Sequence, residues 1–98
     1  MAKLTTVYWR DIPAQVIAKQ RRDTAKIVLS ERFAEAIDKA AMRARMAGTD
    51  AYLEQWRREE VDCDNDLQQA ANTAAERLEQ DFDDARLDAL IKNGGLDP

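Results

Sequence analysis

Hydrophobic and polar positions follow a strand-like pattern near the start of the chain. Residues 4–9 combine aliphatic, β-branched and aromatic side chains, a composition that suits a half-buried strand. Residues 14–19 resume this pattern after an interruption that contains Pro13. Because proline lacks the amide that a sheet ladder needs, the turn is expected there. The pattern therefore predicts a β-hairpin over residues 1–20.

A two-stranded hairpin is only marginally stable in water. It has to lie against helices, gain a further strand or pair with another chain. This requirement makes the hairpin a candidate interface. We expect a partner to meet it around residues 9–16, where unpaired strand edges favour the addition of a strand.

From Thr24 onward the apolar residues recur at three- and four-residue spacing, which is typical of one helix face. Asp23 or Thr24 can cap the start of this helix, and Gly48 suits its end. A start at Ser30 is the rival interpretation, in which residues 26–29 form a third strand. We favour the longer helix. Its apolar stripe consists of Ala25, Leu29, Phe33, Ile37, Ala40 and Ala44.

A second, short helix is expected after Gly48, with Thr49 or Asp50 as its cap. Residues 23–60 are thus predicted to hold two helices. The inner side of the second one carries Tyr52, Leu53 and Trp56.

Residues 61–66 are polar and acidic, and they are interpreted as a linker. A last helix is predicted within residues 64–93, closed by Asn93 and two glycines. Unbroken, its stripe covers about 27 residues and reaches about 40 Å at the rise of an α-helix. Such a helix either breaks near residues 81–84 or projects toward another molecule. Its stripe consists of Leu67, Ala71, Ala74, Leu78, Phe82, Ala85 and Ala89.

These elements predict an α+β fold in which an N-terminal hairpin packs against two or three helices, the last of them long. At 98 residues, with 45% hydrophobic and 35% charged residues, the chain is expected to form a single domain over residues 1–98. No window approaches the apolar length of a membrane span. The lone Cys63 excludes an internal disulfide and favours a reducing, cytoplasmic location.

Charge is distributed unevenly along the chain. Residues 1–58 carry a net charge of +5 and residues 59–98 a net charge of −9. Such halves can pair within one domain or with a second copy, so a homodimer is an open possibility. Arginines near Trp9 and Trp56 raise the question of nucleic acid, but the isoelectric point of 4.8 disfavours a polyanionic partner.

Three aspartates alternate along residues 62–66, as at the start of a calcium-binding loop. However, Leu67 stands where that loop needs glycine, and Thr73 stands where it needs a bidentate glutamate. We therefore expect no metal site here, and interpret Asp64 or Asn65 as the cap of the last helix.

The candidate nucleophiles are weak. Cys63 lies between aspartates, which raise the pKa of a thiol, and the chain has no histidine to act as a base. Ser30 with Lys26 one turn earlier would lie on the outside of a helix. No catalytic residue, cofactor site or metal ligand is predicted.

Several segments of the chain resemble a small bacterial family described as a virulence factor. The resemblance implies a module similar to part of the staphylococcal conserved virulence factor C, where it accompanies helical repeats. It further implies a protein-interaction role and an association with one-carbon, folate and corrinoid methyl-transfer proteins. It supplies no catalytic residues. The matching segments are VYWRDIPAQV at 7–16, LSERF at 29–33, AID at 36–38, AAMR at 40–43, GTDAYL at 48–53, DDARL at 83–87 and NGG at 93–95.

The sequence therefore predicts a non-enzymatic protein-interaction module, an adaptor or accessory subunit, without a membrane segment. The alternative is a regulatory module that binds an anionic small molecule, such as a folate-like compound, through Arg10, Arg21 or Arg22. Nucleic-acid binding is a weaker alternative. The residues expected to contact a protein partner are Tyr8, Trp9, Arg10, Asp11, Ile12, Gln15, Trp56 and Arg57.

Overall fold

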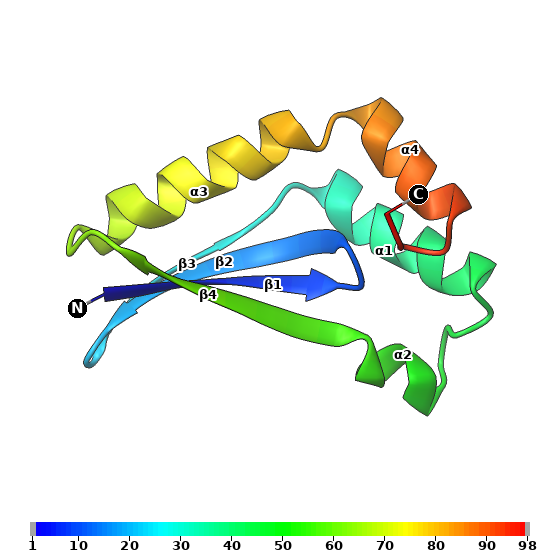
Figure 1. Cartoon of the computed structure of the whole chain (residues 1–98), viewed down its shortest axis with the longest axis horizontal. Helices are drawn as coiled ribbons and strands as arrows, with labels where there is room; N and C mark the ends of the chain where they lie inside the picture. Colours follow the sequence, from blue (N-terminus) through cyan, green and yellow to red (C-terminus); the bar gives the residue numbers. More distant parts are fainter. Residues whose placement is uncertain (1, 98) are drawn as a thin grey trace.

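A computed structural model describes residues 2–97 and shows a four-stranded antiparallel sheet with strand order β3-β2-β1-β4, covered by helices. The predicted α+β class is confirmed. Figure 1 shows α3 along one face of the sheet, α1 and α4 together at its end, and α2 on the opposite side. The elements are β1 (Ala2–Trp9), β2 (Ile12–Gln20), β3 (Asp23–Val28), α1 (Glu31–Arg43), α2 (Asp50–Glu54), β4 (Trp56–Cys63), α3 (Leu67–Asp81) and α4 (Asp84–Lys92).

The predicted hairpin is present as β1 and β2, but its second strand begins earlier than expected. Arg10 and Asp11 form the turn, with Arg10 in the left-handed region at φ 54°. Pro13 lies within β2, opposite Tyr8, where the register shifts between Val7 and Tyr8. Proline is accepted in a strand at such an irregularity because a ladder amide is not needed there.

Residues 23–28 form strand β3, so the longer helix that we favoured is wrong and the rival start at Ser30 is right. β3 pairs with β2 in register, with Ala25 opposite Ala18, and the amide of Leu29 still donates to the carbonyl of Ala14 at 3.0 Å. In so short a segment, apolar residues four positions apart, such as Ala25 and Leu29, are compatible with both a helix and a strand. The β-branched residues at 27–28 and the pairing with β2 decide for the strand.

Residues 56–63 form strand β4, where a helix end and a linker were predicted. β4 pairs with β1 along its whole length, from Trp56 opposite Trp9 to Cys63 opposite Ala2. All its residues are exposed except Cys63, which is half-buried, so its sequence has no apolar alternation that would reveal a strand. The preceding helix α2 has five residues and is capped by Thr49, whose side chain accepts a hydrogen bond from the amide of Tyr52.

The predicted long last helix is divided into α3 and α4, and the break lies at Phe82 and Asp83. The interpretation in which the helix breaks near residues 81–84 is thus confirmed, and one continuous helix is wrong. Phe82 is buried against Phe33 of α1 with an edge-on ring geometry, while the Asp83 side chain caps α4. Asp66, rather than Asp64 or Asn65, caps α3. The sharp turn brings α4 back against α1.

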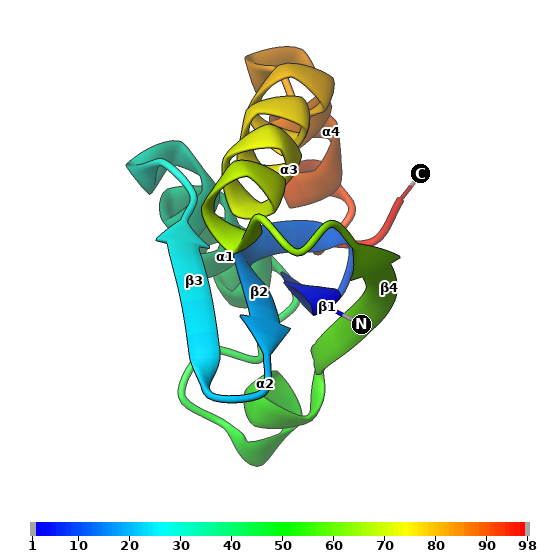
Figure 2. The ribbon, with the colours of Figure 1, turned by 90° about the vertical axis from the view of Figure 1, so that its left-hand side faces the viewer.

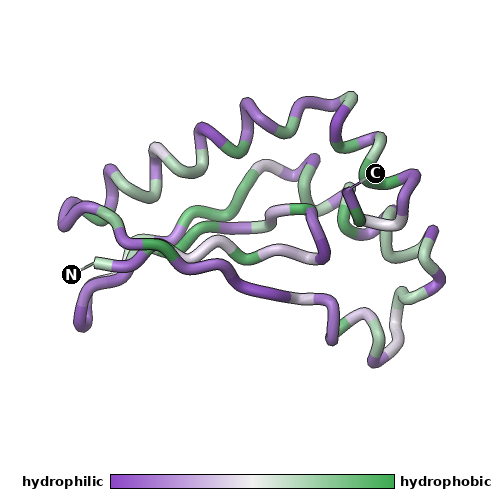
Figure 3. Tube along the Cα trace, viewed as in Figure 1, coloured by the Kyte–Doolittle hydropathy of each residue, from purple (hydrophilic) through white to green (hydrophobic). Residues whose placement is uncertain are grey.

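The core lies between the helices and one face of the sheet. Alanines of α3 pack over small and aliphatic residues of β2 and β3, which allows a close approach of the helix to the sheet. In Figure 3 the apolar segments of these elements face one another. Figure 2 shows α2 on the opposite side of the sheet from α3, and in Figure 1 it lies only near one end of that face. Within residues 2–97, no helix is long and apolar enough to cross a membrane.

Candidate functional site

The tip of the hairpin, expected to be a partner surface, is part of the protein interior. Trp9 and Ile12 are fully buried, and the Trp9 indole nitrogen donates a hydrogen bond to the carbonyl of Tyr52 at 2.9 Å. The hairpin also has no free strand edge, because β1 lies between β2 and β4, and β2 lies between β1 and β3. The prediction of strand addition at residues 9–16 is therefore wrong, since two strands that the sequence pattern did not reveal already occupy those edges.

Arg10 and Asp11 hold three distant segments together at this tip. The Arg10 guanidinium donates to the side chain of Gln55 at 3.2 Å and to the carbonyl of Gly94 at 3.0 Å. The Asp11 carboxylate accepts from the amide of Asp97 at 2.7 Å and from Arg57 at 3.2 Å. Both side chains thus make hydrogen bonds within the chain.

Tyr8 and Arg57 lie beside each other near the exposed edge of the sheet. The Arg57 guanidinium stands 4.4 Å from the centre of the Tyr8 ring and also pairs with Glu59. Burial, followed by the charge of Glu59, raises the pKa of Tyr8. Two further residues of the predicted set, Gln15 and Trp56, come together elsewhere, in a pocket.

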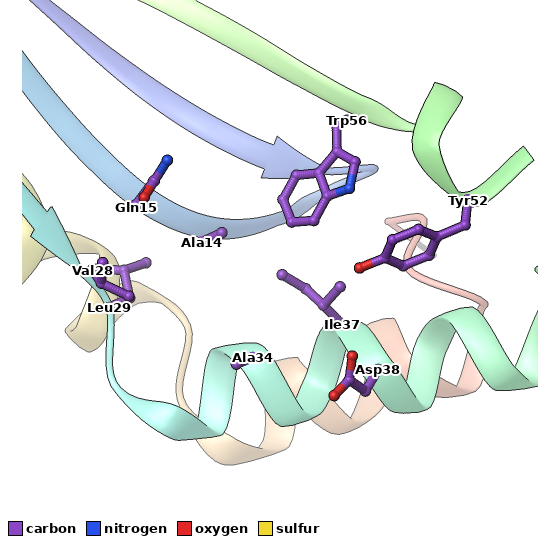
Figure 4. A pocket seen from close by; sticks show the side chains of 9 residues that line it. All are labelled: Ala14, Gln15, Val28, Leu29, Ala34, Ile37, Asp38, Tyr52 and Trp56. Carbon is purple, nitrogen blue, oxygen red and sulfur yellow. The ribbon is translucent and has the colours of Figure 1, made fainter. Parts of the chain in front are cut away.

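This pocket, here called the corner pocket, lies between α1, α2 and the neighbouring ends of β2 and β3 (Figure 4). Its volume is about 220 Å³. Most of its wall is apolar, and its polar groups come from three separate elements. The lining residues are Ala14, Gln15, Val28, Leu29, Ala34, Ile37, Asp38, Tyr52 and Trp56.

Three aromatic rings connect the corner pocket to the core. The Trp9 and Tyr52 rings are stacked with their centres 5.6 Å apart, and the Tyr52 and Trp56 rings meet nearly at right angles with their centres 6.1 Å apart. Trp9 is fully buried, whereas 36% of Trp56 is exposed. Tyr52 thus packs against a buried ring on one side and a partly exposed ring on the other.

Asp38 gives the corner pocket a negative charge. Of the nine lining residues, it is the only one with a charged side chain. It is exposed on α1, and within residues 2–97 no ion pair involves it. Burial, followed by the charge of Asp38, raises the pKa of Tyr52, so the phenol stays protonated and can donate a hydrogen bond.

Exposed apolar side chains gather around this pocket. Val28 and Trp56 line it, and Met42 lines an adjoining pocket that shares Asp38 and Tyr52. Leu53 lies next to Tyr52 in α2. The exposed fractions of Val28, Met42 and Leu53 are 66%, 61% and 65%. We call Val28, Met42, Leu53 and Trp56 the corner surface.

A second concavity, of about 410 Å³, lies on the sheet face opposite α3. Lys19, Arg21 and Arg58 line it together with Lys3, which is paired with Asp62. Of the arginines considered for an anionic ligand, Arg21 lies here, whereas Arg22 is exposed at the turn and does not line the concavity. Its remaining lining residues are Thr5, Ile17, Gln20 and Glu60.

The two candidate nucleophiles lie in different parts of the fold, Cys63 at the end of β4 and Ser30 before α1. Burial, followed by the charges of Asp64 and Asp62, raises the pKa of the Cys63 thiol, as the flanking aspartates predicted. The Ser30 hydroxyl donates to Glu79 at 2.8 Å, so it belongs to the joint between α1 and α3. In the described part of the chain, no group of three or more cysteine or carboxylate side chains is placed to hold a metal ion.

The family model described as "Virulence factor" matches residues 7–91. The chain belongs to the virulence factor family. Comparisons with curated proteins and with solved structures find no match. The residues that match the virulence factor family, 7–91, include every residue that lines the corner pocket.

Sequence reasoning found two of the pocket residues, Gln15 and Trp56, for a different reason, and missed Asp38. Asp38 lies in one of the segments that resemble the family, but nothing in the pattern along α1 distinguishes it from the other exposed charged residues of that helix. Only the return of the chain through α2 and β4 brings Tyr52 and Trp56 next to it.

Proposed function

We propose that this virulence factor family chain is a non-enzymatic protein-interaction module whose partner docks on the corner surface. The observation that carries this proposal is that the exposed Val28 and Trp56 line the corner pocket, while the exposed Met42 lines an adjoining pocket that shares Asp38 and Tyr52. Contiguous exposed apolar side chains are a common mark of protein-binding sites, since monomers seldom leave them in water.

The composition of this surface supports the same proposal. Tryptophan, tyrosine and methionine are enriched at the centre of protein interfaces. Tryptophan and tyrosine bury much area and lose little conformational entropy, because each has only two side-chain torsions. Here Trp56 is anchored through Tyr52 to the buried Trp9, so little ordering is required on binding. A role next to one-carbon or corrinoid methyl-transfer proteins, in the cytoplasm, belongs to the same proposal; the family resemblance and the single free Cys63 support it.

Site-specific photo-crosslinking tests the docking surface. A photoreactive p-benzoylphenylalanine replaces the exposed Leu53 in one variant and the exposed Glu76 of α3 in a matched control. We expect a defined adduct in an extract of the source cells from position 53 and not from position 76. The Trp56→Ala substitution in the Leu53 variant should abolish the adduct. Equal adducts from both positions, or none in a folded protein, would contradict the proposal.

The basic concavity favours a second candidate function, the binding of an anionic small molecule. Lys19, Arg21 and Arg58 face the same hollow on the open side of the sheet, and converging cations of this kind recognise carboxylates and phosphates. Titration with folate, followed by amide chemical shifts, tests this function. We expect saturable shifts that Arg21→Gln weakens and the neighbouring Arg22→Gln leaves unchanged. Absence of saturable shifts at the concavity would exclude this class of ligand.

A further inference from the structure

The corner pocket combines three features that together select a particular chemical group. It has a single negative charge, aromatic rings beside that charge, and an apolar floor. We infer that the corner pocket binds the side chain of a lysine that the protein partner presents. This inference rests on the proposed function, and it names the chemistry of the residue that the partner contributes.

The charge of the pocket requires a cation rather than an anion. Asp38 is the only charged residue in the lining, and no ion pair of residues 2–97 neutralises it. In Figure 4 the Tyr52 hydroxyl and the Asp38 carboxylate point toward the same side of the pocket, beside Ile37. The phenol oxygen and the carboxylate can both accept hydrogen bonds from an ammonium group, which has three donors.

The aromatic rings strengthen the preference for a cation. Trp56 and Tyr52 both line the pocket together with Asp38, and their rings meet nearly at right angles. The face of an indole ring attracts an ammonium group through its quadrupole, and tryptophan does so more strongly than the other aromatic residues. A ligand cation that enters this pocket thus meets a lining with one carboxylate and two aromatic rings.

The apolar part of the pocket fits the stem of a lysine. Leu29 and Ile37 are buried on the inner side, and Ala14, Val28 and Ala34 complete an apolar wall that leads to Asp38. Lysine packs its four-carbon stem along apolar surface while its charged end reaches a polar group. A small ammonium ion without such a stem would leave this wall uncovered. An arginine would cover less of this wall, because its apolar stem is one carbon shorter and ends in a planar fork of donors.

The test uses the full chain and a capped lysine, Nα-acetyl-lysine N-methylamide, as the probe. Binding is followed by the chemical shifts of the Trp56 indole N–H and of the α1 amides, with the buried Trp9 indole N–H as an internal reference. We expect saturable shifts at Trp56 and at residues around 38. Acetylation of the probe's side-chain amine, which removes its charge, should weaken binding about fivefold or more.

Asp38→Asn is the informative variant, because it removes the charge and keeps the shape. Its expected effect is a similar loss of about fivefold in affinity for the lysine probe. Glu35→Gln, which removes a charge from the same helix outside the corner pocket, is the matched control and should leave the affinity unchanged. Equal binding of the charged and acetylated probes, or an unaltered affinity in Asp38→Asn, would overturn the inference.

Two further binding experiments compare the capped lysine with other cations. Methylammonium should bind more weakly than the capped lysine, and the capped arginine should bind no better than the capped lysine. The opposite order in either arm would overturn the lysine assignment. If position 53 forms its adduct while the lysine probe fails to bind, the inference fails and the proposed function stands. If the probe binds but position 53 forms no adduct, the proposed docking of a protein partner is contradicted. The inference is then contradicted too, because it assigns the lysine to that partner.

Discussion

Gly95 lies so close to the indole ring of Trp9 that a Cβ atom at position 95 would stand 2.6 Å from Cζ3 of that ring. Gly95 is also in the left-handed region, with φ 92°, and its carbonyl accepts a hydrogen bond from the amide of Asp11 at 2.9 Å. The chain after α4 therefore seals the buried tryptophan and joins the hairpin turn, and the absence of a side chain at position 95 makes this approach possible.

Gly95→Ala should lower the free energy of unfolding by about 3 kcal/mol, since the added methyl group overpacks against a fixed ring and the backbone conformation is strained. Urea denaturation measures the effect. Gly48→Ala is the control, because Gly48 also has a positive φ, of 75°, but no atom lies within 4 Å of a Cβ built there. Gly48→Ala should lower the free energy of unfolding by only about 1 kcal/mol, because only the backbone conformation is strained there. Equal losses in the two variants would show that the contact with Trp9 is unimportant.

Glu79→Gln should destabilise the joint between α1 and α3. The Glu79 carboxylate accepts hydrogen bonds from the amide and the hydroxyl of Ser30, both at 2.8 Å, and from Arg32 at 3.1 Å. Hydrogen bonds to a charged acceptor are the stronger ones, so we expect a loss of about 1–3 kcal/mol at neutral pH, measured by urea denaturation. Glu76→Gln, on the exposed side of the same helix, should change stability by less than about 0.5 kcal/mol.

The same carboxylate makes a pH-dependent contribution to stability. Burial raises the pKa of Glu79, but the hydrogen bonds from Ser30 and Arg32 outweigh it, so the pKa lies below its ordinary value of 4.5. A lowered folded-state pKa means that the stabilisation is complete above the unfolded-state pKa and is lost as the pH falls through the folded-state pKa. The difference in stability between the natural protein and Glu79→Gln should therefore shrink as the solution is acidified below about pH 4.5. A difference that is constant from neutral to acidic pH would contradict this assignment.

Arg32→Lys should destabilise the bend between α3 and α4 although it keeps the charge. The Arg32 guanidinium donates to the carbonyls of Glu79 and Phe82 as well as to the Glu79 carboxylate. A lysine ammonium cannot reproduce this planar set of donors, so we expect a loss of about 1–2 kcal/mol in thermal or urea unfolding. Arg77→Lys, on the exposed surface of α3, is the control and should be nearly neutral. Rescue of full stability by lysine would show that charge alone matters at position 32.

Cys63 should react with iodoacetamide at pH 8 more slowly than a cysteine with an unperturbed pKa. Burial and the flanking aspartates raise the pKa of its thiol, so a smaller fraction is present as thiolate. Asp64→Asn removes one of these charges and should accelerate the reaction about twofold. The rate is measured by mass spectrometry of the folded protein. The distant Asp88→Asn of α4 should leave the rate unchanged, and an equal acceleration by both variants would argue against a local effect.

Whether a helix or strand could be predicted from the sequence depends on whether its apolar side chains face the core. The hairpin was predicted because its residues have the β-branched, aromatic and aliphatic composition of a half-buried strand. The later part of α1 was predicted because its apolar residues face one core and so repeat with the period of a helix. β4 was missed because an edge strand with both faces exposed needs no apolar alternation: all its residues but Cys63 are exposed. Its place is set by pairing with β1, a relation between residues 47 to 61 positions apart, from Trp9 and Trp56 to Ala2 and Cys63.

The candidate site shows the same division. The sequence indicated Trp9 and Arg10 because aromatic and basic residues in a short strand resemble an exposed binding edge, whereas both residues serve contacts inside the chain. The pocket that is accessible joins Gln15, Asp38 and Trp56 from three elements. No local sequence pattern connects these residues. Their spacing along the chain does not show that β2, α1 and β4 will approach one another at this place.

By itself, the sequence determined the fold class, the hairpin and the short helix with its cap at Thr49 or Asp50, because each depends on residues close together in the chain. Only the tertiary structure decided that residues 23–28 and 56–63 are strands, that Gly95 seals Trp9, and that Asp38 meets Tyr52 and Trp56 in one pocket. Those outcomes depend on pairing and packing between distant segments, whose free energy exceeds the small local preferences of short polar or ambiguous stretches.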